Sequence, residues 1–204
     1  MERLAAQGDN SDSAYDAIFA QREQRGVDEF DVRRWQYLIR YFRGGRLIDL
    51  GTLDSLVPLM AKELYPRAEV WGMDKAEDAI KTMRERYPEV IYEVGDIYKT
   101  QFPTGYFSYV VLGEVLEHLE EPEKCLKEAF RILKSGGTLA LSVPEEEARE
   151  PGAVDIRHLW SFSIKDVREL LGAYGKVKIK VSGSKWFPRY RYAWPIILGW
   201  CYKN

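Results

Sequence analysis

Short β-rich runs alternate with helical segments along most of this 204-residue chain. Parallel strands need long crossover connections, usually helices, so the alternation predicts one α/β domain with a mostly parallel sheet and helices on both faces. Strands are expected at residues 46–50, 69–73, 90–94, 106–112, 138–143, 176–181 and 193–202, and helices at residues 30–42, 55–65, 77–87, 122–134 and 164–174. The last two strands lie close enough in sequence to form an antiparallel pair.

The first 45 residues are predicted to form a helical segment that precedes this sheet. Apolar residues recur at helical spacing in residues 30–42, and Gly44 and Gly45 follow as a stop signal. Further upstream, Tyr15, Ile18 and Phe19 predict a short helix that folds over a cleft.

The composition excludes several classes of protein. A formal net charge of -2 gives no global field for a nucleic-acid backbone, so no nucleic-acid partner is expected. Cys125 and Cys201 lie in neither a CxxC nor a Cys/His spacing, which predicts no disulfide framework and no zinc site. The first twelve residues lack the apolar run of a signal peptide, and the apolar stretch 193–202 is too short to cross a bilayer. We therefore expect a soluble, cytoplasmic chain without a membrane partner.

Acidic residues and a glycine follow three successive predicted strands. Asp49 and Gly51 come at the end of the first, Asp74 ends the second, and Asp96 with Ile97 follows the third. Ligands of open α/β sheets bind at the carboxyl ends of the strands, where an acid after the second strand can accept from ribose hydroxyls. Each position also has a structural alternative, since a strand-to-helix turn or a helix cap uses the same residue types.

The segment after the fourth strand is the most specific part of the sequence. Residues 113–119 read Gly-Glu-Val-Leu-Glu-His-Leu, and residues 129–137 read Ala-Phe-Arg-Ile-Leu-Lys-Ser-Gly-Gly. Together with the acids at the strand ends, residues 46–144 resemble the class I S-adenosylmethionine-dependent methyltransferases of the small-molecule group. The resemblance implies a Rossmann-like seven-stranded sheet whose terminal strand is antiparallel, and S-adenosylmethionine as cofactor. It divides the single domain into an N-terminal cap (1–45), a cofactor-binding core (46–144) and an acceptor-side region (145–204).

The resemblance also implies roles for individual residues. Asp49 and Gly51 would flank the methionine part of the cofactor, and Asp74 would hold the ribose. Asp96 and Ile97 would meet the adenine.

The same resemblance implies roles for three further residues. Lys75, next to Asp74, belongs to the cofactor-binding group. Gly113 and Glu114 would lie where the sulfonium and the acceptor meet, which makes Glu114 a catalytic candidate.

The first motif departs from the family pattern, which has glycines where this chain has Leu53 and Ser55. Leu53 brings a side chain to a place where backbone usually approaches the ligand, and leucine disfavours positive φ. One alternative is therefore a catalytically silent methyltransferase-like module that binds a partner. Another is a nucleotide-binding dehydrogenase-type fold. The double glycine after the helix expected at residues 122–134 and the terminal hairpin disfavour this fold.

The two histidines are candidates for catalysis. His158 precedes the late helix, in the region that faces the acceptor in such enzymes, and is predicted as general base, with packing near Trp160 as its alternative. His118 is a second candidate that would help to shape the site. The spacing of acids and histidines does not demand a metal, and none is expected.

The turn 185–192 interleaves cations with aromatic residues. Aromatic faces suit sugar rings, and arginine suits phosphate oxygens, so we expect a small hydroxylated acceptor, phosphorylated or nucleotide-linked, that is methylated on oxygen. A loop that packs its aromatic residues on the sheet is the alternative, and an oligomer is left open. The expected substrate-binding residues are Lys185, Trp186, Arg189 and Arg191.

Overall fold

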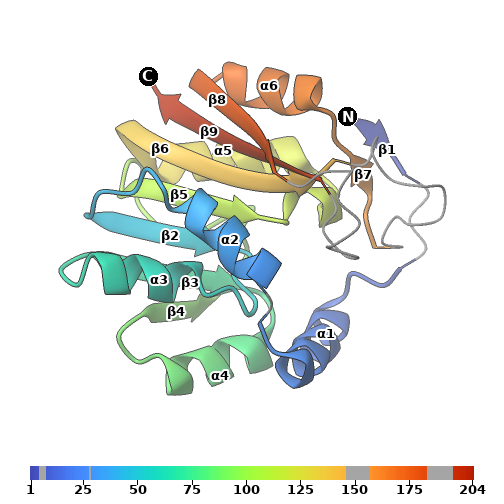
Figure 1. Cartoon of the computed structure of the whole chain (residues 1–204), viewed down its shortest axis with the longest axis vertical. Coiled ribbons are helices and arrows are strands. Elements are labelled where there is room, and N and C mark those ends of the chain that lie inside the picture. Colours follow the sequence, from blue (N-terminus) through green and yellow to red (C-terminus); the bar gives the residue numbers. More distant parts are fainter. Residues whose placement is uncertain (5–7, 28, 146–156, 183–194) are drawn as a thin grey trace.

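The computed structural model describes residues 1–4, 8–27, 29–145, 157–182 and 195–204 (Figure 1). In chain order the elements are β1 (Glu2–Arg3), α1 (Asp12–Arg25), α2 (Glu29–Leu38), β2 (Arg46–Leu50), α3 (Val57–Leu64), β3 (Glu69–Asp74), α4 (Glu77–Arg86), β4 (Ile91–Val94), β5 (Phe107–Gly113), the 3-10 turn η1 (Leu116–His118), α5 (Pro122–Ile132), β6 (Leu133–Pro144), β7 (Trp160–Ser161), α6 (Ile164–Gly172), β8 (Gly175–Ser182) and β9 (Ile196–Lys203). None of the helices in these ranges is both long and apolar enough to cross a bilayer.

The central sheet has seven strands in the order β4-β3-β2-β5-β6-β9-β8. The five strands from β4 to β6 pair in parallel, whereas β9 is antiparallel to both β6 and β8. The predicted Rossmann-like sheet with an antiparallel terminal strand is thus confirmed. The strand order reverses between β2 and β5, and this switch point is where open α/β sheets bind ligands.

Helices cover both faces of the sheet. Buried side chains of α2, α3 and α4, such as Trp35, Val57 and Ile80, pack on one face. Leu126 of α5 and Val167 of α6 pack on the other. Figure 1 shows α2 in front of the strands and α5 behind them, so the sheet is covered on both sides and its carboxyl edge is left for a site.

The predicted helix ends differ from the observed ones by one to four residues. The helix expected at residues 122–134 ends at Ile132, and β6 starts at Leu133, five residues before the expected strand. Lys203 of β9 donates to the carbonyl oxygens of Phe130 and Leu133 at 2.7 and 2.6 Å, which satisfies carbonyls that the helix end leaves open. Similarly, α2 ends at Leu38 and the chain continues as a turn over residues 39–41.

The N-terminal segment has two attachments away from the main sheet. Strand β1 pairs antiparallel with β7, a two-residue ladder that is too short to leave a periodic pattern and that the sequence did not predict. The expected short helix is present as α1, and its Phe19 is 4% exposed. The beginning of the chain therefore reaches both the acceptor-side region and the carboxyl edge of β3.

Candidate active site

A cavity of about 1370 Å³ opens at the carboxyl ends of β2, β3, β4 and β5, where α1 forms part of its wall. Ligand pockets usually have a volume of roughly 300–1,000 Å³, so this cavity has room for two reactants together. Tyr15, Ile18 and Arg22 of α1 face it across from the strand ends.

The turn after β2 is tied to the neighbouring strand. The N–H groups of Gly51 and Thr52 donate to the carbonyl oxygen of Met73 at 2.8 and 3.0 Å. Gly51 has a φ of 75°, and a Cβ on it would come within 2.6 Å of Val115 Cγ2. Glycine is required here by both the backbone conformation and the contact with Val115.

Leu53 adopts the conformation that the family glycine would supply. Its φ is 38°, and its N–H donates to Asp74 Oδ2 at 2.8 Å. Its side chain, 8% exposed, packs with Phe19 of α1 and with Ala76 and Ala79. Leu53 thus holds α1 against the turn, and the cavity beside it remains open.

Asp74 stabilises the backbone turns at the ends of β2 and β3 and also faces the cavity. Its Oδ1 accepts from the N–H of Ala76 at 3.0 Å, a turn bond that precedes α4, whereas the N-cap of α4 is Ala76 and has no side-chain cap. Asp74 also lines the cavity, and burial raises its pKa. Each carboxylate oxygen has a second lone pair, which can accept from a ribose hydroxyl, so the ribose role remains a prediction.

Asp49 lies behind the turn that forms the cavity wall. It is 2% exposed, and its Oδ2 accepts from Thr52 Oγ1 at 3.1 Å. Burial raises the pKa of Asp49 to about 7, and the neighbouring charge of Asp74 adds to this effect. We therefore expect Asp49 to act on the cofactor through the turn it supports.

The expected adenine residues line the cavity at the end of β4. Asp96 Oδ1 accepts from the N–H of Tyr98 at 2.8 Å, which stabilises the turn, and Ile97 packs against the core. At the end of β3, Lys75 Nζ donates to the carbonyl oxygen of Asn10 at 2.7 Å. Lys75 thus fixes the segment before α1 beside the cavity.

Gly113 and Glu114 lie at the end of β5 and line the same cavity. Glu114 has a φ of 57°, and its N–H donates to the carbonyl oxygen of Ser142 at 3.0 Å. Its Oε2 is 3.6 Å from Arg34, which also contacts Asp31 of α2 at 2.9 Å. This ion-pair network presents a carboxylate at the β5 end of the cavity.

The two histidines lie together, and His118, rather than His158, lines the cavity. His118 lines the cavity, and its ring lies 4.8 Å from the ring of His158, centroid to centroid. His158 is 6% exposed and lies behind His118, because the N–H of Leu159 donates to the carbonyl oxygen of Glu117 at 2.6 Å. Of the two imidazoles, that of His118 lines the cavity, and His158 is not among the lining residues.

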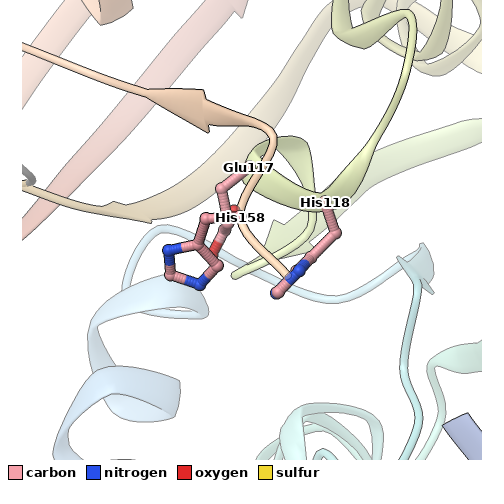
Figure 2. Close-up of side chains that lie close together, drawn as sticks. All are labelled: Glu117, His118 and His158. Atoms are coloured by element: carbon pink, nitrogen blue, oxygen red, sulfur yellow. The ribbon is translucent and has the colours of Figure 1, made fainter. Parts of the chain in front are cut away.

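Glu117 completes this group and was missed by the sequence reasoning. Its side chain is 0% exposed and lies with both imidazoles, as Figure 2 shows. One potential ligand atom from each of the three residues lies within 4.8 Å of the others. The adjacent Glu-His pair in η1 was a signal, but its partner is 40 residues further on.

Part of the predicted acceptor site falls on residues that the structure does not describe. The expected substrate-binding residues in the turn 185–192 are among them: Lys185, Trp186, Arg189 and Arg191. Among the described residues, Arg22 and Arg157 line the cavity and were not predicted. Arg22 Nε lies 2.9 Å from Asp54 Oδ2, so part of this positive charge is paired.

The fold and the cavity define the class of protein. A sheet of this order with an antiparallel strand next to its edge, and acids lining a cavity at the ends of β3 and β4, is the arrangement of the class I S-adenosylmethionine-dependent methyltransferases. Residues 48–141 match the family described as "Methyltransferase domain". Residues 48–141 are thus a methyltransferase domain with the class I fold, whose cofactor is S-adenosylmethionine.

Similar proteins support this assignment. A demethylmenaquinone methyltransferase from Listeria welshimeri is 28% identical over 165 residues, which cover 77% of this chain and 63% of that protein. The match thus spans less than two thirds of the relative's length. A Thermotoga maritima structure, described as an S-adenosylmethionine-dependent methyltransferase and possible histamine N-methyltransferase, matches with a TM-score of 0.74 and 16% identity, covering 94% of this chain and 99% of that chain.

A third match comes from a complex with the cofactor. Haemonchus contortus phosphoethanolamine N-methyltransferase 2, solved with S-adenosyl-L-methionine, has a TM-score of 0.63 and 14% identity, covering 85% of this chain and 52% of that chain. At such identity the structural matches show the fold alone. The named relatives modify different acceptors, so the acceptor must be inferred from this chain's own cavity.

Proposed function

We propose that this chain transfers a methyl group from S-adenosylmethionine to an oxygen of a small hydroxylated acceptor, such as a sugar or a nucleotide-linked sugar. The observation that carries the proposal is that different polar side chains line one cavity at its two ends. Carboxylates Asp96 and Asp74 line it at β4 and β3, and Glu114 and His118 line it beyond β5. The first pair suits an adenosyl group, and the second suits a hydroxyl that must lose its proton.

The reaction places modest demands on the protein. An acceptor hydroxyl attacks the methyl carbon, the carbon–sulfur bond breaks with its electron pair left on sulfur, and the hydroxyl proton is released. Holding the two reactants aligned supplies much of the rate enhancement in such a displacement. The imidazole of His118 at the cavity wall, with that of His158 packed against it, promotes the loss of the proton.

The lining of the acceptor end favours a polar acceptor. Arg22, Arg157 and Glu114 border the cavity together with the aromatic ring of Tyr15. Aromatic faces stack on sugar rings, and guanidinium groups bind phosphate oxygens. A purely apolar acceptor would displace water from these charged groups and offer them no hydrogen bonds in return.

A methyl-transfer screen with labelled S-adenosylmethionine tests this proposal. The panel contains free sugars, nucleotide-linked sugars, phenols, quinols and amines, and the labelled product is analysed by carbon NMR to identify the methylated atom. We expect an O-methyl product from a hydroxylated acceptor. Label only on nitrogen or carbon would contradict the proposed atom.

The silent-module alternative needs a separate measurement. Calorimetric titration with S-adenosylhomocysteine should give one binding event per chain, because Leu53 packs under α1 and the cavity remains open. Folded protein that gives no heat would favour a partner-binding module instead.

A further inference from the structure

We propose that Glu117, His118 and His158 bind one divalent transition-metal ion at the cavity wall, and that this ion receives the acceptor's oxygen. The role toward the acceptor rests on the proposed function, whereas metal binding itself does not. The three side chains come from η1 and from the segment before β7, and all are directed into one small space in Figure 2.

The spacing of the three side chains fits a shared ion. Their potential ligand atoms lie within 4.8 Å of one another. Ligands bound at about 2.1 Å from an ion lie roughly 3–4 Å apart, so small side-chain rotations bring them into coordination. Two imidazoles with one carboxylate form a ligand set that suits zinc, iron, cobalt and manganese.

The backbone around the cluster holds the ligands in place before any ion binds. The N–H of Leu159 donates to the carbonyl oxygen of Glu117 at 2.6 Å, and Trp160 Nε1 donates to the carbonyl oxygen of Leu119 at 2.7 Å. These bonds fix the segment that carries His158 against η1. A site built from two distant segments is thereby preorganised.

The contact of His118 with a backbone carbonyl oxygen fits a metal ligand that coordinates through Nε2. His118 Nδ1 lies 3.4 Å from the carbonyl oxygen of Arg157, which can only accept, so Nδ1 carries the proton in this contact. In this tautomer Nε2 is the ring nitrogen that can coordinate a metal ion. Metal-binding histidines in proteins commonly donate their second N–H to a carbonyl oxygen in this way.

The location of the cluster gives the ion a function. Glu117 and His158 are buried, whereas His118 lines the cavity. An ion with three protein ligands keeps open coordination positions, and these would face the cavity. A hydroxyl bound there has a lowered pKa, which favours loss of its proton before methyl transfer.

Metal binding is tested on the untagged full-length chain, since a histidine tag would itself bind the probes. Stripped protein is titrated with Mn²⁺, followed by the loss of the free-ion electron paramagnetic resonance signal, and with Co²⁺, followed by its visible absorption. We expect one ion per chain, and at least about 100-fold weaker binding for Glu117→Gln, His118→Gln and His158→Gln. Glu120→Gln is the matched control, because Glu120 is an exposed carboxylate three residues after Glu117 that pairs with Arg3.

The outcomes separate metal binding from the proposed function. Binding by wild type and Glu120→Gln, together with loss in the three variants whose folding is verified by thermal melting, supports the site. No binding by folded wild type, or equal binding by wild type and Glu117→Gln, overturns it. Titration with S-adenosylhomocysteine in the same samples shows that the cofactor site is intact, so failure of the metal site leaves the proposed methyl transfer standing. Conversely, metal binding without any O-methyl product contradicts the proposed function but still supports the metal site.

Discussion

The cofactor side and the acceptor side of the cavity are built in different ways. On the cofactor side, Asp74 and Asp96 accept from backbone N–H groups two residues further along the chain, so each carboxylate is fixed by its own turn. On the acceptor side, His118 and His158 meet only because a segment 40 residues away packs against η1. The cofactor side thus depends on local backbone geometry, and the acceptor side depends on tertiary contacts.

The largest expected effect is a loss of turnover when a histidine on the acceptor side is replaced. His158→Gln should lower turnover by about 100-fold or more, since an imidazole that promotes proton loss contributes at least this much. Affinity for S-adenosylhomocysteine should change by less than about twofold, because His158 lies with Glu117 and His118 near η1. Turnover and calorimetric affinity are measured on the same preparation. Unchanged turnover would remove His158 from the reaction.

Asp74→Ala should show the opposite pattern and affect cofactor affinity. The change removes an acceptor for a ribose hydroxyl and leaves the N–H groups of Leu53 and Ala76 without their partner. Affinity for S-adenosylhomocysteine should fall about tenfold to 100-fold, as expected for hydrogen bonds to a charged group. Glu85→Ala, an exposed position on α4, is the control for calorimetry. Equal affinity in Asp74→Ala and wild type would contradict the ribose role.

Leu53 allows strain and burial on the cofactor side to be separated. Leu53→Ala keeps a side chain in the left-handed region and loses the packing with Phe19, so it should lower the free energy of unfolding by about 2–3 kcal/mol. Leu53→Gly loses the same packing but relieves the backbone, and should be more stable than Leu53→Ala by about 1 kcal/mol. Urea unfolding gives both values. An alanine variant as stable as the glycine variant would exclude strain at this turn.

The fourth expected effect is a pH dependence of stability at Asp49. Because its pKa is raised from 3.8 to about 7 in the folded protein, its contribution to stability is fully present below about 4 and is lost as the pH rises to about 7. Asp49→Asn does not titrate, so its stability relative to wild type should increase across this window and level off above it. Urea unfolding between pH 4 and pH 8 measures the difference, with Glu85→Gln as control. A difference that is independent of pH would show that Asp49 titrates normally.

The sequence predicted the sheet well because its signals are local. The strand expected at residues 46–50 matches β2 exactly in its bounds, and the antiparallel pairing of β8 with β9 followed from their closeness in sequence. The end of α5 was placed too late, because the contact from Lys203 that stabilises the earlier end comes from the other end of the chain.

The part of the candidate site that lies at strand ends could also be predicted from the sequence. Asp74, Asp96 and Glu114 follow strands, so the sheet alone brings them to one cavity. The buried position of His158 and the convergence with Glu117 depend on packing between segments without a shared periodicity. Such convergence leaves no pattern in one sequence, and only the structure reveals it.

The attachments of α1 have a consequence for how the cofactor exchanges. Leu53 packs against Phe19, and Lys75 holds Asn10, so the turn next to the ribose position also secures the N-terminal segment. We expect spent cofactor to leave along this side only after those two contacts separate. Its residence time is therefore coupled to the opening of α1, and a chain that begins after α1 should exchange cofactor faster while its sheet remains folded.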